Sequence, residues 1–106
     1  MITLYIRYTL DPNKLRDFEA YARALATPIE RCGGTPVGYY LPTKLAGPMN
    51  AAVGLIDFPS LAAYEKYREK LGVDPEAAEI TRRLEASGAL LNEERSFVSC
   101  VPESRR

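Results

Sequence analysis

The chain has 106 residues, of which 46% are hydrophobic and 26% charged, and its fourteen basic residues balance its fourteen acidic ones. This is the composition of one globular domain, and a net charge of zero gives no field that would attract nucleic acid or an anionic membrane. No apolar run approaches the ~20 residues of a membrane span. The chain contains no histidine, which removes the usual general base, the usual haem ligand and the commonest zinc ligand. We therefore expect no cofactor or metal, no nucleic-acid partner and no membrane span.

The two cysteines, Cys32 and Cys100, are far apart in the sequence and form no C-x-x-C motif. This spacing argues against a zinc site or a thioredoxin-like site. We interpret both as small buried hydrophobic residues that stay reduced, and we expect a cytoplasmic protein.

Hydrophobic periodicity and turn residues predict seven elements along the chain. Strands are expected at residues 1–10, 35–43, 49–58 and 90–101, and helices at residues 12–31, 61–72 and 75–87. Asp11-Pro12, Pro59-Ser60 and Asp74-Pro75 each combine a helix-capping residue with a proline, which is typical of a helix start. Gly38 in the second strand suggests a bulge, which leaves the facing of Tyr39 and Tyr40 open. Residues 1–102 should form one domain, followed by a tail of residues 103–106.

The heptapeptide Leu-x-x-aromatic-Glu-x-Tyr occurs twice, at residues 15–21 and 61–67. Each copy follows a strand and begins a helix, so the repeat indicates two similar strand-helix halves. The element order then predicts an α+β, ferredoxin-like βαββαβ fold, with a four-stranded antiparallel sheet and the helices on one face.

A single helix layer leaves the second face of the sheet uncovered. In residues 1–10, Tyr5 and Arg7 alternate with apolar residues and should lie on that face. In the last strand we expect Arg95 and Phe97 to join them. Aromatic and arginine side chains are enriched at protein interfaces, so we expect a homodimer that pairs through this face.

The order of several short segments resembles the NIPSNAP family, within the dimeric α+β barrel superfamily. The matching residues are the segments 5–9, 34–40, 52–58, 74–76 and 94–97, together with Pro12, Lys14-Leu15, Ser60-Leu61, Tyr64 and Arg68. The resemblance implies a ferredoxin-like protomer that pairs through its sheets, and the family has no generally established reaction. Members of the wider superfamily include cofactor-independent monooxygenases, haem-degrading enzymes and small-acid lyases or isomerases. The haem-binding members rely on a histidine, which this chain lacks.

Arginine and tyrosine side chains are the candidates for a site. A guanidinium fixed on a strand could hold a carboxylate or an enolate oxygen, and tyrosine combines an apolar wall with a hydroxyl. The predicted ligand-binding residues are Arg7, Tyr8, Tyr39, Tyr40, Tyr64, Arg68 and Arg95, with Tyr67 beside them. For Arg7 the alternative is an interface ion pair with Glu93 or Glu94, and for the tyrosines it is a place in the core. Asp57 is a candidate base or, alternatively, caps the turn into Pro59.

We hypothesise a homodimeric NIPSNAP-like barrel that binds a small organic ligand or serves as an assembly module. The alternative is a cofactor-independent monooxygenase or isomerase that acts on a small aromatic or keto-acid substrate. This alternative depends on analogy with the superfamily, since no arrangement of residues in the sequence identifies a reaction.

Overall fold

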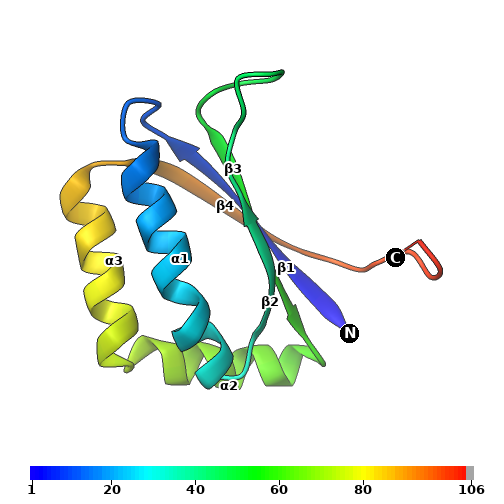
Figure 1. Cartoon of the computed structure of the whole chain (residues 1–106). Coiled ribbons are helices and arrows are strands. Elements are labelled where there is room, and N and C mark those ends of the chain that lie inside the picture. The colour runs from blue at the N-terminus through cyan, green and yellow to red at the C-terminus, as the bar shows by residue number, and fades with distance from the viewer. Residues whose placement is uncertain (105–106) are drawn as a thin grey trace.

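The computed structural model describes residues 1–104, and Figure 1 shows its secondary structure. The elements are, in order, β1 (Ile2–Leu10), α1 (Leu15–Arg31), β2 (Thr35–Tyr40), β3 (Ala51–Phe58), α2 (Leu61–Gly72), α3 (Pro75–Ser87) and β4 (Leu90–Val98). Each expected strand and helix is therefore present. The expected tail, residues 103–106, is described only to residue 104. No helix within the described part of the chain is long and apolar enough to cross a membrane.

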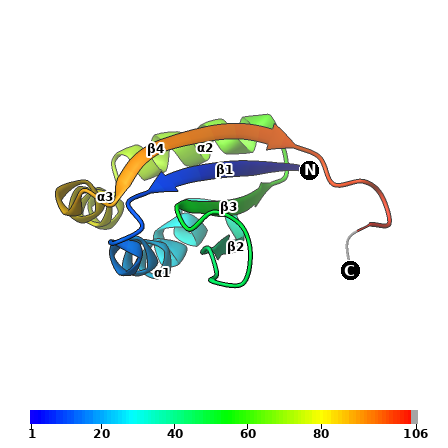
Figure 2. The same ribbon diagram turned by 90° about the horizontal axis from the view of Figure 1, so that it is seen from above.

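The four strands form one antiparallel sheet in the order β2-β3-β1-β4, which Figure 2 shows from above. The helices lie on one side of this sheet (Figure 1). The predicted ferredoxin-like α+β fold is thus confirmed. We call the two sides of the sheet the helix face and the outer face.

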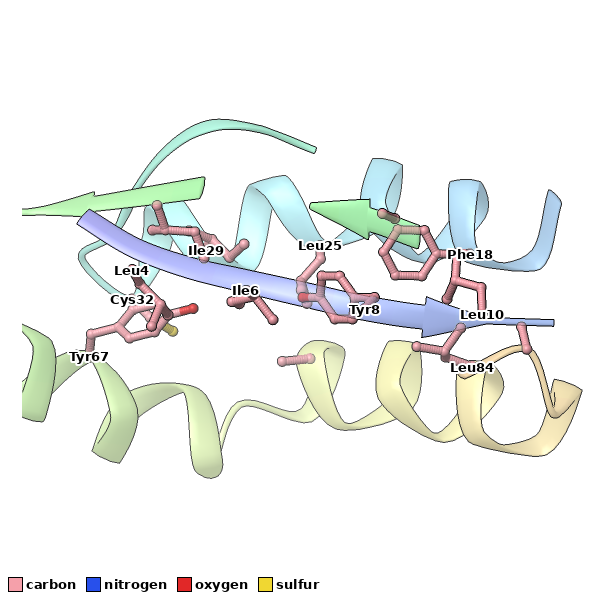
Figure 3. Packing of buried hydrophobic residues seen from close by; sticks show 14 of the residues in the cluster. Leu4, Ile6, Tyr8, Leu10, Phe18, Leu25, Ile29, Cys32, Tyr67 and Leu84 are labelled. Atoms are coloured by element: carbon pink, nitrogen blue, oxygen red, sulfur yellow. The ribbon is translucent and has the colours of Figure 1, made fainter. Parts of the chain in front are cut away.

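The central strand β1 carries the core. Leu4, Ile6, Tyr8 and Leu10 point to the helix face and are each 2% exposed or less. They pack against apolar side chains from all three helices, as Figure 3 shows. The alternation in residues 1–10 therefore predicts the facing of β1 correctly, because only one of its two faces is continuously apolar.

Helix α1 begins later than predicted. The Asp11 carboxylate accepts a hydrogen bond from the Asn13 backbone N–H at 3.0 Å, and the Lys14 N–H donates to the Asp11 carbonyl at 2.9 Å. Asp11 thus forms a local turn, a common alternative to an N-cap for this residue type. The helix starts at Leu15 and includes Pro28.

The other two helix starts agree with the prediction. The Ser60 hydroxyl accepts from the Ala63 N–H at 3.1 Å, and the Asp74 carboxylate accepts from the Ala77 N–H at 2.8 Å. Pro75 occupies the first turn of α3, and Gly88 ends the helix at a φ of 74°, a conformation that favours glycine.

A hydrogen bond at one end and a salt bridge at the other connect α1 with α3. The Lys14 ammonium donates to the Ser87 carbonyl at 2.8 Å. At the other end the Arg31 guanidinium contacts the Asp74 carboxylate at 2.7 Å. These contacts hold the two helices antiparallel beside the sheet.

Several predicted details are wrong. Strands β2, β3 and β4 are each shorter than expected, and residues 41–50 form a loop. Cys32 is buried, but Cys100 follows β4 and is exposed. Leu61, the first leucine of the second heptapeptide copy, is 54% exposed, because it is the first residue of α2.

Candidate functional site

The register of β4 corrects one prediction about the sheet faces. Arg95 lies opposite Ile6 and Phe97 lies opposite Leu4, so both belong to the helix face and not to the outer face. The outer-face position opposite Arg7 is instead occupied by Glu94. Neither alternating set of residues in β4 is continuously apolar, so hydrophobicity alone could not decide this facing.

The register of β2 places its two tyrosines on opposite sides of the sheet. A register shift between Pro36 and Gly38 confirms the predicted bulge. Beyond it, Tyr39 lies opposite Gly54 and Tyr40 lies opposite Val53. Gly54 is on the helix face, since its partner in β1 is Ile6. Tyr39 therefore faces the helices, whereas Tyr40 lies on the outer face and is 53% exposed.

Gly54 makes room for the ring of Tyr39. A Cβ atom at this position would lie 2.7 Å from Cε1 of Tyr39 and 3.1 Å from its Cδ1 and Cζ. Glycine at this position leaves space on the helix face of β3. At Gly54 that space is filled by the aromatic ring of the neighbouring strand.

Four tyrosines from different elements converge on the helix face: Tyr8 of β1, Tyr21 of α1, Tyr39 of β2 and Tyr67 of α2. We call these four the tyrosine cluster. The Tyr8 hydroxyl lies 3.5 Å from that of Tyr39, at the limit of a hydrogen bond, and the ring centroids of the two are 6.1 Å apart. Tyr8 is almost completely buried and is labelled with Tyr67 in Figure 3.

Burial raises the pKa of the hydroxyls of the cluster above the ordinary tyrosine value. It raises the pKa of Tyr39 to about 12, although the hydrogen bond with Tyr8 acts in the opposite direction. It also raises the pKa of Tyr8, and the nearby phenols of Tyr39 and Tyr21 add to this effect. The pKa values of Tyr21 and Tyr67 are likewise raised, mainly by burial. At neutral pH these phenols are protonated, as tyrosine normally is, and each has a proton to donate in a hydrogen bond.

Arg95 supplies a positive charge beside the cluster. Its guanidinium Nη2 lies 3.6 Å from Glu93 Oε2, and the two side chains are 38% and 36% exposed. Burial lowers the pKa of Arg95, but the charge of Glu93 and the hydroxyls of Tyr8 and Tyr64 have a larger combined effect and raise it. Arg95 is thus charged and shares its interactions between a carboxylate and phenols.

Tyr64 of α2 forms an aromatic edge of this region. Its ring meets Phe97 of β4 edge-on at a centroid distance of 4.8 Å, and it meets Phe58 in the same manner at 5.2 Å. Phe97 is 46% exposed. An aromatic surface therefore reaches solvent next to Arg95.

The structure separates the predicted site residues into groups. Tyr8, Tyr39, Tyr64, Tyr67 and Arg95 come together on the helix face. Arg7 and Tyr40 lie on the outer face, and Arg68 is exposed on α2, so these three are not part of the cluster.

Arg68 and a further candidate, Asp57, have other surroundings. Arg68 lines a separate hollow of about 420 Å³ between α2 and α3, with Leu71 and Ala77 in its wall. Asp57 is buried on the outer-face side of β3, where it accepts a hydrogen bond from the Thr3 hydroxyl at 2.6 Å. It cannot act as a base at the tyrosine cluster.

Sequence reasoning missed Tyr21 and Glu93 as members of the site. A signal for Tyr21 was present, because it occupies the same final position of the repeated heptapeptide as Tyr67. Glu93 was considered only as a partner of Arg7, but it lies opposite Tyr8.

Tyr21 and Tyr39 also line surface hollows of about 200 Å³ and 310 Å³ on either side of α1. Within residues 1–104, no group of three or more acidic or cysteine side chains could hold a metal ion.

Comparison with known proteins identifies the family. The NIPSNAP family profile matches residues 4–105. The chain belongs to the NIPSNAP family. A comparison with curated protein sequences found no match.

Solved structures agree with the NIPSNAP fold. An uncharacterized NIPSNAP domain protein from Burkholderia xenovorans is 18% identical, with a TM-score of 0.82 and 100% of both chains covered. A NIPSNAP family protein of unknown function from Agrobacterium tumefaciens is 19% identical, with a TM-score of 0.84 and coverage of 98% of this chain and 91% of that one. SnoaB, a cofactor-independent oxygenase from Streptomyces nogalater, is 18% identical, with a TM-score of 0.65 and coverage of 99% and 97%. At these identities the likeness concerns the fold.

Proposed function

We propose that this NIPSNAP protein is a cytoplasmic homodimer that pairs through the outer face of its sheet and binds a small organic ligand on the helix face. The observation that carries the ligand-binding function is the convergence of the tyrosine cluster on Arg95. The cytoplasmic setting is supported by the two free cysteines, one buried and one exposed.

The outer face supports pairing with a second copy. The helices leave it uncovered, and it presents Tyr40 and Val98, which are 53% and 44% exposed. Arg7 and Glu94 lie directly opposite each other there, and both are exposed. In a two-fold arrangement the same patch meets itself, so that Arg7 can contact the partner's Glu94 and Glu94 the partner's Arg7.

Sedimentation velocity tests the dimer. The wild type should sediment as a dimer at micromolar concentration, and Arg7→Glu should dissociate it because like charges would then face each other. The charge swap Arg7→Glu with Glu94→Arg should restore the dimer. Arg16→Glu, at an exposed position of α1, is the control for a change of net charge. A monomeric wild type would refute the pairing.

The ligand site is supported by its supply of donors. Protonated phenols and a charged guanidinium offer several hydrogen-bond donors around a half-exposed position, next to aromatic walls. Such a combination suits an organic molecule with an acceptor oxygen and an apolar body. The hydroxyls come from four elements, so the fold holds their relative positions.

Thermal unfolding with a panel of small aromatic and keto acids tests this function. A ligand at 100-fold its dissociation constant should add about 2.7 kcal/mol, which raises the Tm by about 10–20 °C in a domain of this size. Tyr39→Phe removes a hydroxyl from the cluster and should reduce the shift. Tyr40→Phe removes one from the outer face and should not. No shift with any compound, or equal shifts in the two variants, would contradict the proposed site.

A second candidate function is a cofactor-independent oxygenase or isomerase of a small aromatic or keto-acid substrate. The observation that favours it is the carboxylate of Glu93, whose charge acts on Tyr8, Tyr21 and Tyr39. A carboxylate base beside phenol donors can remove a substrate proton while the donors and Arg95 stabilise the anion. The fold similarity to SnoaB, described as an oxygenase, supports the same reading.

Two measurements separate the outcomes. An oxygenase should consume O₂ with a compound from the thermal panel, because the deprotonated substrate then supplies the electrons. An isomerase should exchange substrate hydrogen with deuterated solvent without consuming O₂. Glu93→Gln should abolish either activity. Turnover that persists in this variant would exclude Glu93 as the base.

A further inference from the structure

The ion pair between Glu93 and Arg95 is loose compared with another on the same chain. Its shortest N–O distance is 3.6 Å, whereas Arg31 and Asp74 approach to 2.7 Å. Charge-assisted hydrogen bonds are usually about 2.7–2.9 Å long. The Glu93 carboxylate thus lies beside the guanidinium without a close hydrogen bond to it.

The surroundings of this pair are open on one side. Strand β4 is an edge strand, and its helix-face residues Glu93, Arg95 and Phe97 are all exposed, while the helix-face residues of β1 are buried. The helix layer thus covers the centre of the sheet but leaves β4 accessible. The Tyr64–Phe97 ring pair stands at this opening.

We propose that Glu93 occupies the place of a ligand's anionic oxygen, and that the site takes a planar aromatic monoanion whose carboxylate replaces Glu93 beside Arg95. The aromatic ring of the ligand would pack against Phe97 and Tyr64. This inference rests on the proposed ligand-binding function and names its ligand class.

Arg95, Glu93 and the ligand carboxylate each have a suitable environment both before and after the exchange. A half-exposed ion pair contributes little to stability, so Arg95 loses little when Glu93 leaves, and at the edge of the sheet the released carboxylate remains in water. The incoming carboxylate meets the guanidinium and the protonated phenols, which are all donors. A neutral ligand cannot replace the charge of Glu93 beside Arg95, so the site should prefer anions.

The proposal is tested by titrating the protein with 4-fluorobenzoate and with neutral 4-fluorobenzamide. Binding is followed by ¹⁹F NMR and by the Arg95 Nε–Hε resonance. The benzoate should bind more tightly than the amide and shift the Arg95 resonance. Glu93→Gln should tighten benzoate binding about fivefold, since a competing half-exposed carboxylate is worth about 1 kcal/mol. Arg95→Gln should lose benzoate binding. Glu69→Gln, at an exposed position of α2, changes the net charge as much as Glu93→Gln does and should leave the affinity for benzoate unchanged.

Three results would overturn the inference. If the amide binds as tightly as the benzoate, or if Glu93→Gln does not tighten benzoate binding, the Glu93 exchange is wrong, although the ligand site itself remains. If neither probe binds the wild type or Glu93→Gln, the aromatic-anion class is wrong, and the thermal panel alone decides the ligand-binding function. Circular dichroism of each variant verifies the fold before titration.

Discussion

Substituting Gly54 by alanine should disturb the tyrosine cluster through Tyr39. The added methyl group would lie 2.7 Å from Cε1 of the Tyr39 ring, closer than carbon atoms can approach. The ring cannot simply swing away, because it is half-buried and its centroid is 6.1 Å from that of Tyr8 and 6.3 Å from that of Phe18. Relief requires a shift of β2 or of the neighbouring rings.

The expected cost follows from the packing. One extra carbon in a well-packed interior destabilises a protein by about 1–3 kcal/mol, and replacing a strand glycine by alanine returns about 0.5–1 kcal/mol. The net loss for Gly54→Ala should be about 1–2 kcal/mol. In a domain of this size each kcal/mol lowers the Tm by about 4–8 °C.

Urea unfolding followed by circular dichroism measures this change, with Gly38→Ala as the matched control. A Cβ at Gly38 would also meet a tyrosine, at 2.9 Å from the Tyr40 hydroxyl. Tyr40, however, is exposed and its hydroxyl is the far end of a flexible side chain, so it can move at little cost. Gly38→Ala should therefore leave the free energy of unfolding within about 0.5 kcal/mol of the wild type.

The double variant Gly54→Ala with Tyr39→Leu identifies the cause. If the clash is with the ring, the two substitutions should be coupled by about 1 kcal/mol or more, because the alanine costs less once the ring is gone. Equal stability of Gly54→Ala and the wild type, or strictly additive effects in the double variant, would refute the account of Gly54 as the space for Tyr39.

Three other predictions concern pH and capping. Stability should fall as the pH rises above about 10, because unfolded tyrosines then lose protons that the folded cluster retains. The rise in the pKa of Tyr39 to about 12 alone corresponds to about 2 kcal/mol by pH 12, and urea unfolding at a series of alkaline pH values measures the slope. Stability should also fall as the pH drops from about 4.5 towards 2. The reason is that hydrogen bonds from Arg82 lower the pKa of Glu79 to about 2, and hydrogen bonding from Arg31 lowers the pKa of Asp74. A Tm that stays constant across this range would contradict the prediction. Ser60→Ala removes the N-cap of α2 and should cost about 1 kcal/mol in the same assay, whereas Ser60→Asp should not.

Local sequence signals predicted those parts of the fold that depend on local chemistry. Asp74-Pro75 and Gly88 mark both ends of α3, because a carboxylate cap, a proline in the first turn and a left-handed glycine each act within a few residues. The apolar alternation of β1 likewise depends on neighbouring residues only, and it predicted the buried face of the strand. At Asp11 the local rule allowed both a cap and a turn, and the turn is what forms.

The candidate site could be predicted only in part, because it depends on register between strands. Tyr8 lies in a strand whose facing is decided by its own apolar pattern. Arg95 lies in a strand with charged residues on both faces, and only its pairing with Ile6 shows its side. Tyr21 joins the cluster through the packing of α1 against the sheet, a contact between distant segments that periodicity alone cannot show.

The bulge in β2 has a consequence for changes in chain length. Because side chains alternate along a strand, one residue more or fewer exchanges the faces of all residues beyond it. In β2 that extra residue is Val37, between Pro36 and Gly38. Deleting it would remove the bulge and leave Tyr39 opposite Gly54 on the helix face and Tyr40 opposite Val53 on the outer face, if the remaining pairs keep their partners. A NIPSNAP chain that kept Val37 but paired it regularly would exchange the faces of the two tyrosines, so the bulge decides which of them lies at the proposed ligand site and which on the proposed dimer surface.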